Sequence, residues 1–571
     1  MVSVDGKNFA EAKFPHNFNV DKQQAYTVLE SVTNSVFLHV TVSARPGSEY
    51  GSILKSNSNG TQYVVSLENV NRDEQGFVDF EKMQGLEGVA IVNSVENPKE
   101  VHQGSRKKLK TKITHNDGAE WEYLRAPKKD SEGKDVSCNP SDLKTCSLNL
   151  HGYTERLDYR DTFSSQSAIG LMIGVGNVGE YLTPYQEGNT YLTRDGGVTW
   201  QEIKKGSFMW EFGDSGSVVV IVNGKEPTNR VFYSLDEGKS WKEYQFSDDL
   251  VKVDDIATLP SDTSRKFLLL GRQPAKKGEK SFTIQVDFTG LTDRQCVLDP
   301  EDPSMSDFEL WTPSHPLMED NCLFGHEAQY HRKIPGKNCY IGRSDMNKPH
   351  KVIKNCTCTR RDFECDFNYQ RVNDGTCKLV PGYSPPDHSS VCDEFPDAVE
   401  YWEPTGYRRI PLSTCQGGQE LDHVVSYPCP GKEDEYKKKH RGLHGLGLFF
   451  VIVLPIGMTG VIGYIVWDHY SKRYGQIRLG EEEDDQPAVI QYAIISVAAI
   501  VAVASVVPSF FKSVYSHIEY AIRSRTGRYT SRNAFVRGRQ RYTAVDAEDE
   551  GELLRGDSSD DDIMADSDDE L

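Results

Sequence analysis

Cysteines are the residues whose number and spacing point most clearly to chemistry in this sequence. Ten of the twelve lie between Cys296 and Cys429. Thiols at this density either pair as disulfides in an oxidising compartment or bind zinc as thiolates. The zinc alternative draws on Cys356, Cys358 and Cys365, but the paired CxxC knuckles common in zinc sites are missing from this stretch.

An even set of cysteines in a loop-rich stretch that contains prolines therefore predicts a disulfide framework made in the secretory lumen. No metal or other cofactor is expected. The residues expected in disulfides are Cys138, Cys146, Cys296, Cys322, Cys339, Cys356, Cys358, Cys365, Cys377, Cys392, Cys415 and Cys429. Two asparagines, Asn59 in Asn-Gly-Thr and Asn355 in Asn-Cys-Thr, are N-glycosylation acceptors that fit the same compartment.

A second set of polar side chains recurs in the pattern Ser/Thr-x-Asp-x-Gly-x-x-Trp. The hydroxyl and the carboxylate can accept hydrogen bonds from backbone N–H groups that a tight turn leaves unpaired, and the glycine fits a positive φ. Runs rich in β-forming residues flank the pattern, which places it on β-hairpins. The two full copies are Thr193, Asp195, Gly197 and Trp200, and Ser234, Asp236, Gly238 and Trp241.

Looser copies of the pattern occur upstream, at Thr114–Trp121 (Thr114, Asn116, Gly118, Trp121), at Ser56–Tyr63 (Ser56, Ser58, Gly60, Tyr63) and, one residue shorter, at Ser3–Phe9. Such hairpins are the Asp-boxes of β-propellers, and their spacing of roughly 40 to 80 residues fits four-stranded blades with insertions. We expect the boxes to be solvated turns that stabilise the blades without binding a ligand, because the turn itself uses their polar groups.

Two apolar segments follow the cysteines. The segment at 442–467 is long enough to span a bilayer and has polar flanks, so it is predicted to be a transmembrane helix. The segment at 487–511 is also long enough, but a second crossing would return the basic stretch after residue 511 to the lumen, against the positive-inside rule. We therefore favour a second segment that enters or lies along the membrane, and leave a second span as the alternative.

The tail carries three kinds of short cytosolic signal. Tyr542 and Val545 form a Tyr-x-x-apolar adaptor signal, and Leu553 and Leu554 form an acidic dileucine signal. Serines that precede acidic runs are candidates for phosphorylation, namely Ser558, Ser559 and Ser567. The alternative is a disordered, solvated acidic tail.

The net charge and the first residues bear on the partners of the protein and on its export. The net charge of −20 and the lack of interleaved basic and aromatic residues argue against a nucleic-acid partner. The first residues have no basic region followed by an apolar stretch, so no signal peptide is predicted. Because disulfides require export, we expect an N-terminally truncated version of a longer protein.

The Asp-boxes, the ten cysteines and the span together resemble the sortilin family, in particular its fungal vacuolar sorting receptors. The most specific stretches are 307–342 and Cys356–Tyr369 in the cysteine region, with 206–222 and 79–95 upstream. The resemblance implies a mainly β fold: a partial propeller of about five blades from a ring of ten (1–292), a disulfide-rich ten-cysteine module (293–431), a transmembrane helix (442–467), a polar loop (468–486), the second hydrophobic segment (487–511) and a tail (512–571).

The resemblance also implies a function. Members bind soluble vacuolar hydrolases of the carboxypeptidase Y kind in the late Golgi, deliver them to an endosomal or prevacuolar compartment, and return with retromer-type or clathrin-adaptor machinery. Acidification could drive release, with His315, His326 and His331 beside the module as pH sensors. The cargo-binding residues are unknown. The alternatives are a truncated, non-functional paralogue or gene fragment and a sialidase-like glycosidase, but no clustered arginines and paired acids support an enzyme.

Overall fold

The computed structural model describes residues 1–15, 26–30, 33–155, 163–274, 278–299, 302, 304–318, 320–342, 351–372, 374–389, 391–394, 397–440, 460–461, 463–465 and 468. The chain divides into two compact units, Met1–Gly442 and Leu443–Leu571. The described residues lie almost entirely in the first unit.

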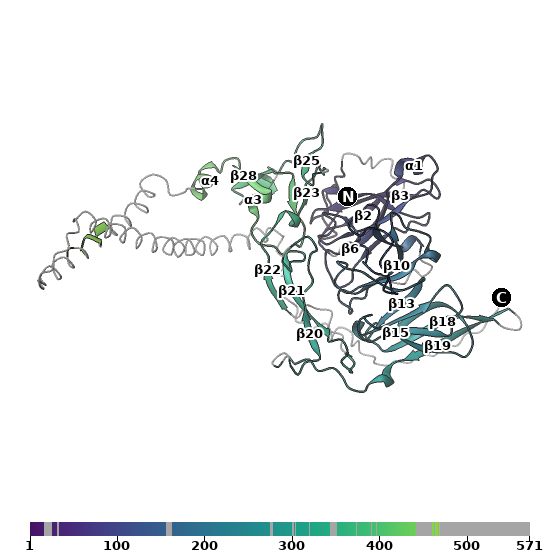
Figure 1. The fold of residues 1–571 in the computed structure, drawn as a ribbon. Coiled ribbons are helices and arrows are strands. Elements are labelled where there is room, and N and C mark those ends of the chain that lie inside the picture. The colour runs from purple at the N-terminus through teal and green to yellow at the C-terminus, as the bar shows by residue number, and fades with distance from the viewer. Residues whose placement is uncertain are drawn as a thin grey trace, which may run out of the picture. The chain divides into compact units, whose positions relative to one another are not determined.

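Antiparallel sheets follow one another along the first part of this unit (Figure 1). The first sheet joins two meanders through β4 and β6. Its strands are β1 (Tyr26–Glu30), β2 (Phe37–Ser43), β3 (Tyr50–Ser56), β4 (Tyr63–Asn71), β5 (Phe80–Lys82), β6 (Ala90–Val95), β7 (Leu109–Thr114) and β8 (Glu122–Tyr123), with the short helix α1 (Pro98–His102) between β6 and β7.

Three further meanders come after it along the chain. Two have four strands and one has three: β9 (Ser147–Leu150), β10 (Met172–Gly179), β11 (Asn189–Thr193) and β12 (Gln201–Lys204); β13 (Phe208–Gly213), β14 (Val218–Asn223), β15 (Arg230–Ser234) and β16 (Lys242–Gln245); β17 (Lys252–Leu259), β18 (Lys266–Pro274) and β19 (Glu279–Asp287). Repeated up-and-down sheets of this size are propeller-like.

Strand β14 shows why these sheets stack face to face. It is a continuous run of valine and isoleucine in which successive side chains point to opposite faces. Val219 and Ile221 lie in one hydrophobic cluster, and Val218, Val220 and Val222 lie in another. The sheet is therefore covered on both faces, which an alternating apolar and polar strand would not allow.

The Asp-box patterns join the third and fourth strands of these meanders. Each of Ser56, Thr114, Thr193 and Ser234 is the last residue of its strand. At the two full copies the hydroxyl accepts the N–H of Gly197 or Gly238, at 3.0 and 2.8 Å, and both glycines have positive φ. The Asp195 and Asp236 carboxylates accept the N–H four residues on, each at 2.8 Å.

The looser copies keep this arrangement to different degrees. At Ser3–Phe9 the Asp5 carboxylate accepts the N–H groups of Lys7 and Asn8, both at 2.8 Å. At Ser56–Tyr63 the pattern position Ser58 is not the acceptor of the turn. The side-chain oxygen of Asn57 accepts the Thr61 N–H instead, at 2.8 Å. The pattern residues Ser3 and Asp5 therefore act as acceptors at the first site, whereas Asn57, outside the pattern positions, is the acceptor at the second.

The cysteine module (293–431) contains only short strands and helices. Its sheets are β20–β21–β22, β23–β27, β24–β25 and β26–β28. The elements are β20 (Phe308–Trp311), β21 (His326–Lys333), β22 (Lys351–Asn355), β23 (Phe363–Cys365), β24 (Tyr369–Arg371), β25 (Cys377–Leu379), α2 (Val391–Glu394), β26 (Glu400–Pro404), β27 (Tyr407–Arg409), α3 (Gln419–Asp422) and β28 (His423–Pro428), followed by α4 (Glu433–Lys439).

Disulfides hold these small sheets, which are too short to bury a large core. All twelve cysteines are paired: Cys138–Cys146, Cys296–Cys339, Cys322–Cys356, Cys358–Cys415, Cys365–Cys377 and Cys392–Cys429. Cys356, Cys358 and Cys365 each belong to a different disulfide, so these three thiols do not form a zinc site.

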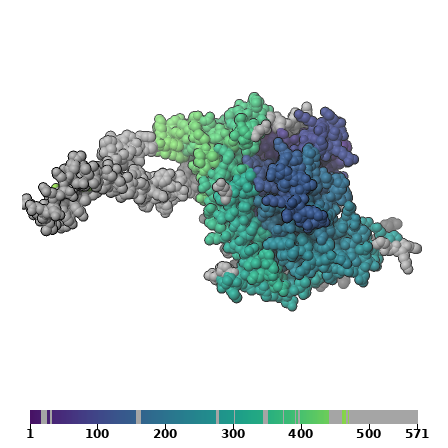
Figure 2. All heavy atoms as spheres, in the orientation of Figure 1, coloured from purple at the N-terminus to yellow at the C-terminus, as the bar shows by residue number. Residues whose placement is uncertain are grey.

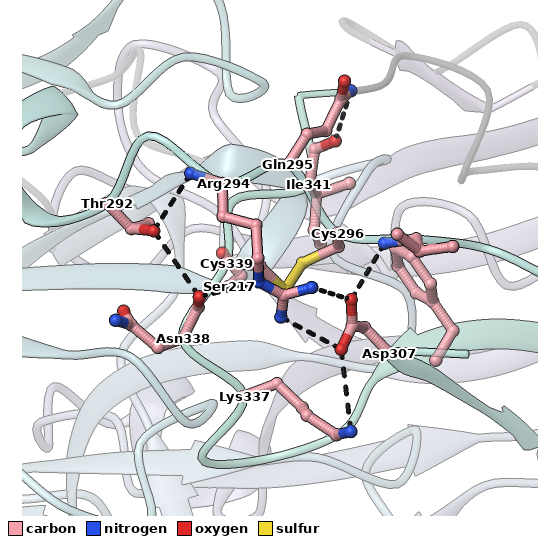
Figure 3. Close-up of a disulfide and its surroundings, with 12 residues drawn as sticks. Ser217, Thr292, Arg294, Gln295, Cys296, Asp307, Lys337, Asn338, Cys339 and Ile341 are labelled. Carbon is pink, nitrogen blue, oxygen red and sulfur yellow. Dashed lines mark hydrogen bonds and ion pairs between the residues drawn. A yellow bond between two sulfur atoms is a disulfide. The ribbon is translucent and has the colours of Figure 1, made fainter. Parts of the chain in front are cut away.

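An ion pair lies beside the first of the module's disulfides (Figure 3). The Arg294 guanidinium donates two hydrogen bonds to the Asp307 carboxylate, at 2.7 and 3.1 Å, and the Val297 N–H donates a third at 2.9 Å. These bonds to Arg294 lower the pKa of Asp307 to about 2. Asp307 therefore fixes the residues on both sides of Cys296 at neutral pH.

Within the described residues, no helix has the length and apolar character needed to cross a membrane. The predicted hydrophobic segment 487–511 lies outside these residues, as does most of 442–467. The tail residues Tyr542, Val545, Leu553, Leu554, Ser558, Ser559 and Ser567 also lie outside them.

We predict that Asp236→Ala destabilises the first unit by about 1–2 kcal/mol, because it removes the acceptor of a turn N–H group. Asp236→Asn is the matched control. Its amide oxygen can still accept the Ser240 N–H, as the Asn116 oxygen accepts the Glu120 N–H at 2.9 Å. Thermal unfolding should place the Asn variant close to the parent, and equal losses in both variants would contradict this role.

Candidate functional site

The cysteine module packs against the part of the sheets that carries the Asp-box turns. Figure 2 shows the teal and green module in contact with the purple and blue sheets. Three of the turns, which we call the docking turns (114–121, 193–200 and 234–241), contribute polar groups to this interface or to its edge. We take the interface as the candidate functional site, because it joins the two parts of the first unit.

The first docking turn has an asparagine where the full pattern has an aspartate. The Asn116 oxygen serves the turn, while its Nδ2 donates to the Arg361 carbonyl of the module at 3.1 Å. A carboxylate could not make this second bond, because it has no hydrogen to donate. The same turn presents Glu120, whose carboxylate pairs with Arg361 at 2.5 Å and with Arg371 at 3.2 Å.

A buried charge network lies directly beneath this turn. The Lys55 ammonium, on β3, is 2.8 Å from the Asp117 carboxylate and 2.9 Å from the Glu364 carboxylate of β23. The Lys55 residue is 0% exposed, and both carboxylates are also buried. Lys55 also donates to the Asp117 carbonyl at 2.8 Å, so all three of its N–H bonds have acceptors.

Arg408 of β27 extends the network on the module side. Its Nε donates to Glu364 at 2.8 Å, and its two Nη atoms donate to the Gln62 and Lys55 carbonyls, each at 3.2 Å. A buried charge is costly unless it is paired and hydrogen-bonded. Lys55, Asp117 and Glu364 therefore stabilise the fold only when the module is in place.

The other two docking turns meet at one arginine of β21. The Arg332 guanidinium donates to the Glu237 carboxylate at 2.7 and 3.1 Å and to the Arg194 carbonyl at 2.7 Å. It also lies over the Trp311 ring, 4.7 Å from the ring centre. One planar cation thus joins two neighbouring turns, which a lysine ammonium could not do with the same geometry.

Asp214, in the turn between β13 and β14, makes a further contact. Its carboxylate accepts the N–H groups of Ile341 and Gly342, at 2.9 and 2.8 Å. Asp214 and the next residue, Ser215, both have positive φ, a conformation that is unfavourable for residues other than glycine. The strained turn therefore aims the carboxylate at the module backbone.

Two histidines meet at the interface, with ring centres 5.6 Å apart. His115 is bonded to the Gly196 carbonyl at 2.9 Å, and the Nδ1 of His315 accepts the Leu317 N–H at 3.1 Å. Burial lowers the pKa of His115 to about 4, and burial, with His115 and Arg361 nearby, lowers the pKa of His315 to about 3. Both rings are therefore neutral in the folded protein at pH 7.

The expectation that the Asp-boxes are solvated turns is wrong for the first docking turn. Asn116 is only 5% exposed and bonds to the module, and Asp117 is 6% exposed and bonds to Lys55. The turns use the oxygen atoms of the pattern for themselves, as expected, but Asn116 also donates to the module and Glu237, between the pattern positions, accepts from it. Asp117 reaches the module only through Lys55, which pairs with Glu364. Recurrence identified the turns, whereas their partners lie far away in the sequence.

The residues of this interface outside the turns were not found by sequence reasoning. The position of Lys55 within a strand-like stretch could have indicated a buried cation, and a buried lysine needs a partner of opposite charge. Nothing in the sequence pairs it with Glu364, about 300 residues later. Of the other predicted residues, Asn59 and Asn355 are exposed, and His326 lies 3.1 Å from the Thr414 hydroxyl.

Comparison with known proteins identifies this arrangement of sheets and module. The family profile described as "Sortilin, neurotensin receptor 3" matches residues 1–256, and the profile described as "Sortilin, neurotensin receptor 3, C-terminal" matches residues 258–429. The chain belongs to the sortilin family. This membership agrees with the expectation that the chain is a relative of sorting receptors and not an enzyme.

Curated proteins from fungi are similar to this chain over nearly its whole length. The chain is 51% identical over 577 residues to the vacuolar protein sorting/targeting protein 10 of Coccidioides posadasii, a match that covers 98% of this chain and 39% of the relative. It is 51% identical over 578 residues to the protein of that name from Blastomyces gilchristii, covering 98% and 38%. The chain therefore spans about two fifths of the length of these sortilin-family relatives.

Solved structures are more distant. The β-propeller domain of the trilobed protease from Pyrococcus furiosus is 12% identical, with a TM-score of 0.22, over 55% of this chain and 82% of that one. A similarity this low carries no argument about the fold, which rests on the sheets described above.

We predict that Lys55→Met destabilises the first unit by about 3–5 kcal/mol, because it leaves Asp117 buried without its counter-charge and Glu364 with Arg408 alone. Lys354→Met, which removes the exposed pair with Glu327, is the control and should cost less than about 1 kcal/mol. Chemical denaturation measures both. Adding Asp117→Asn to Lys55→Met should recover most of the loss, since Glu364 keeps Arg408 as its counter-charge. A Lys55→Met variant as stable as the parent would contradict the network.

We also predict that the first unit loses stability as the pH falls from about 6.5 towards 4. Histidines with a lowered folded-state pKa stay neutral in the fold, whereas the unfolded chain takes up protons, so falling pH favours unfolding. For each of His115 and His315 the loss between pH 7 and pH 5 is about 2 kcal/mol. Replacing both by glutamine should reduce the dependence of the melting temperature on pH by about half, since the buried His39 and His151, also with a pKa lowered to about 4, contribute the rest. An unchanged slope would contradict the part of His115 and His315 in it.

Proposed function

We propose that this chain is a transmembrane sorting receptor that binds soluble vacuolar hydrolases, of the carboxypeptidase Y kind, in the lumen of the late Golgi. It delivers them to an endosomal or prevacuolar compartment and recycles. The observation that carries the proposal is the 51% identity over 98% of the chain to fungal proteins named for vacuolar protein sorting and targeting. The sheets and the disulfide-bonded module support a lumenal location for residues 1–440.

The sheets β1–β19 are the blades of a propeller in this proposal, and the module holds their Asp-box turns in place. The docking turns then form a rigid base, so that cargo is bound by other loops of the sheets. Such a base suits a receptor, because a preorganised surface spends less of the binding free energy on ordering itself.

The membrane part of the proposal has one crossing. The segment 442–467 spans the bilayer, the segment 487–511 enters it without crossing, and the tail from residue 512 faces the cytosol. This arrangement keeps the basic residues after position 511 on the cytosolic side. There Tyr542 with Val545, and Leu553 with Leu554, bind clathrin-adaptor or retromer-type machinery, and phosphorylation of Ser558, Ser559 or Ser567 adds negative charge beside them.

A second candidate function is an incomplete receptor that reaches the membrane but holds no cargo. The observation that favours it is the outer face of the first sheet. There Tyr26 and Val28 are 69% and 57% exposed, and a groove of about 600 Å³ lies between the strands β1 and β2 and N-terminal residues that include Met1 and Phe14. Blades of a closed propeller cover such faces, and within the described residues no neighbouring sheet covers this one.

We predict that Tyr542→Ala combined with Leu553→Ala and Leu554→Ala redirects the chain from Golgi and endosomal membranes to the vacuole or the cell surface. The reason is that both signals are read by extended-peptide pockets that need these side chains. Fluorescence microscopy of the tagged full chain measures the change. The control is Tyr529→Ala, in the basic part of the tail outside both signals, which should leave the distribution unchanged.

Cargo binding separates the two candidate functions. In cells that lack their own receptor, the full chain should reduce secretion of a vacuolar carboxypeptidase if it is a complete receptor. Unaltered secretion together with correct Golgi and endosomal location would support the incomplete receptor, and unaltered location of the tail variant would count against both.

A further inference from the structure

The acceptor tripeptide Asn355-Cys356-Thr357 lies across two disulfides of the module. Its residues alternate, since the Asn355 and Thr357 side chains are exposed while Cys356 and Cys358 are 4% and 6% exposed. Cys356 is bonded to Cys322 and Cys358 to Cys415. The residue that would carry a glycan and the hydroxyl that the transferase requires thus point outwards from a segment tied down at both buried positions.

Backbone bonds hold the same segment on both sides. The Cys356 N–H donates to the Gly325 carbonyl at 2.9 Å, and the Gln416 N–H donates to the Cys356 carbonyl at 2.7 Å. Asn355 pairs with His326 at the end of β22, and Thr357 forms a bridge with Gln416. The tripeptide is therefore held by two other segments of the folded module, at Gly325–His326 and at Gln416.

We propose that Asn355 is N-glycosylated, and that transfer takes place before the Cys322–Cys356 disulfide closes. A transferase acts on an acceptor that can leave the protein surface and bend into its active site, which is why acceptors are found in flexible surface segments. Once Cys356 and Cys358 are bonded, this tripeptide has no such freedom. The exposed Asn355 side chain accommodates the finished glycan, but the folded segment does not accommodate the reaction.

The transfer of the oligosaccharide to Asn355 needs no oxidant or reductant. The Asn355 Nδ2 attacks the anomeric carbon of an oligosaccharide carried on a lipid diphosphate. A carbon–nitrogen bond forms, the carbon–oxygen bond to the diphosphate breaks, the amide loses one proton and the lipid diphosphate leaves. Disulfide closure is a separate oxidation of Cys322 and Cys356, and the two reactions compete only for the conformation of the same segment.

Asn355 is the last residue of an exposed edge strand, β22. Strand β22 pairs with β21, and among the described strands it has no partner on its other edge. Val352 and Ile353 on this strand are 52% and 41% exposed. Exposed apolar edge strands favour association between chains, and a bulky polar group at the end of the strand opposes it.

Asn59 supplies an internal comparison. It is exposed in a turn, with the Thr61 hydroxyl donating to its side-chain oxygen at 3.0 Å, and its tripeptide contains no cysteine. Transfer to Asn59 therefore does not compete with a disulfide. The inference rests on the proposed function only in requiring that the chain enters the secretory lumen.

The test measures the occupied fraction of Asn355 and Asn59 in the full chain, by peptide mass spectrometry of the total membrane fraction after enzymatic removal of glycans. Thr357→Ser makes Asn355 a weaker acceptor, so its occupancy should fall below that of the parent. Cys322→Ala added to Thr357→Ser should restore occupancy, because the competing disulfide cannot form. Cys138→Ala, which breaks the distant Cys138–Cys146 disulfide, should restore nothing, and Asn59 should not respond to either cysteine variant.

Glycans are added before folding, so a variant that misfolds still reports its occupancy. A brief pulse of a membrane-permeant thiol reductant during synthesis should raise occupancy at Asn355 in the Thr357→Ser chain without any cysteine substitution. An Asn355 that is unmodified in every chain, or one indifferent to both Cys322→Ala and the reductant, overturns the proposal. If Asn355 behaves in this way while the disulfides have formed and Asn59 is glycosylated, only the inference about Asn355 fails. Free thiols and no glycan at either asparagine would overturn the proposed lumenal function as well.

Discussion

The structure depends on a lysine ammonium that is fully buried between two parts of the chain. Lys55 pairs with Asp117 on its own side and with Glu364 on the module side, and Arg408 of the module also pairs with Glu364, so the four charges form one network across the interface. Burying such a set gains little net stability compared with apolar packing, but losing one member is costly. We therefore see the network as the element that requires the sheets and the module to be together. Arg332 and Asp214 fix the position of the module at the later sheets, through bonds to Glu237 and to the Gly342 N–H.

The Asp-box turns serve two purposes because their pattern fixes only alternate positions. The hydroxyl, the carboxylate and the glycine satisfy the turn, and the positions between them are free to vary. Arg194 and Glu237 occupy these positions and bind the module, through a carbonyl and a side chain. Asp117 pairs with Lys55, which in turn pairs with Glu364 of the module. At Asn116 even a pattern position contributes, since an amide can accept from the turn and donate to the module.

Sequence reasoning predicted the features that depend on local chemistry. The strand-turn-strand units, the turn hydrogen bonds of Thr193 and Asp195, and the family resemblance all follow from neighbouring residues. It was wrong about the solvation of the turn at Asn116, since burial there depends on a module nearly 250 residues away. Likewise the lowered pKa of His315 comes from burial, which no local pattern around that histidine reveals. The pairing of Lys55 with Glu364 could not be predicted, because opposite charges are common and only the fold selects two of them.

Hydrogen exchange at the turn amides tests most directly the claim that the module covers the Asp-box turns. In the full chain, the amides of Gly118 and Glu120 should exchange as slowly as those of strand β7, while those of Lys7 and Asn8, in an exposed turn with the same kind of hydrogen bonds, should exchange quickly. Equally fast exchange in the two turns would show that the module does not rest on them, and the account of the interface would be wrong.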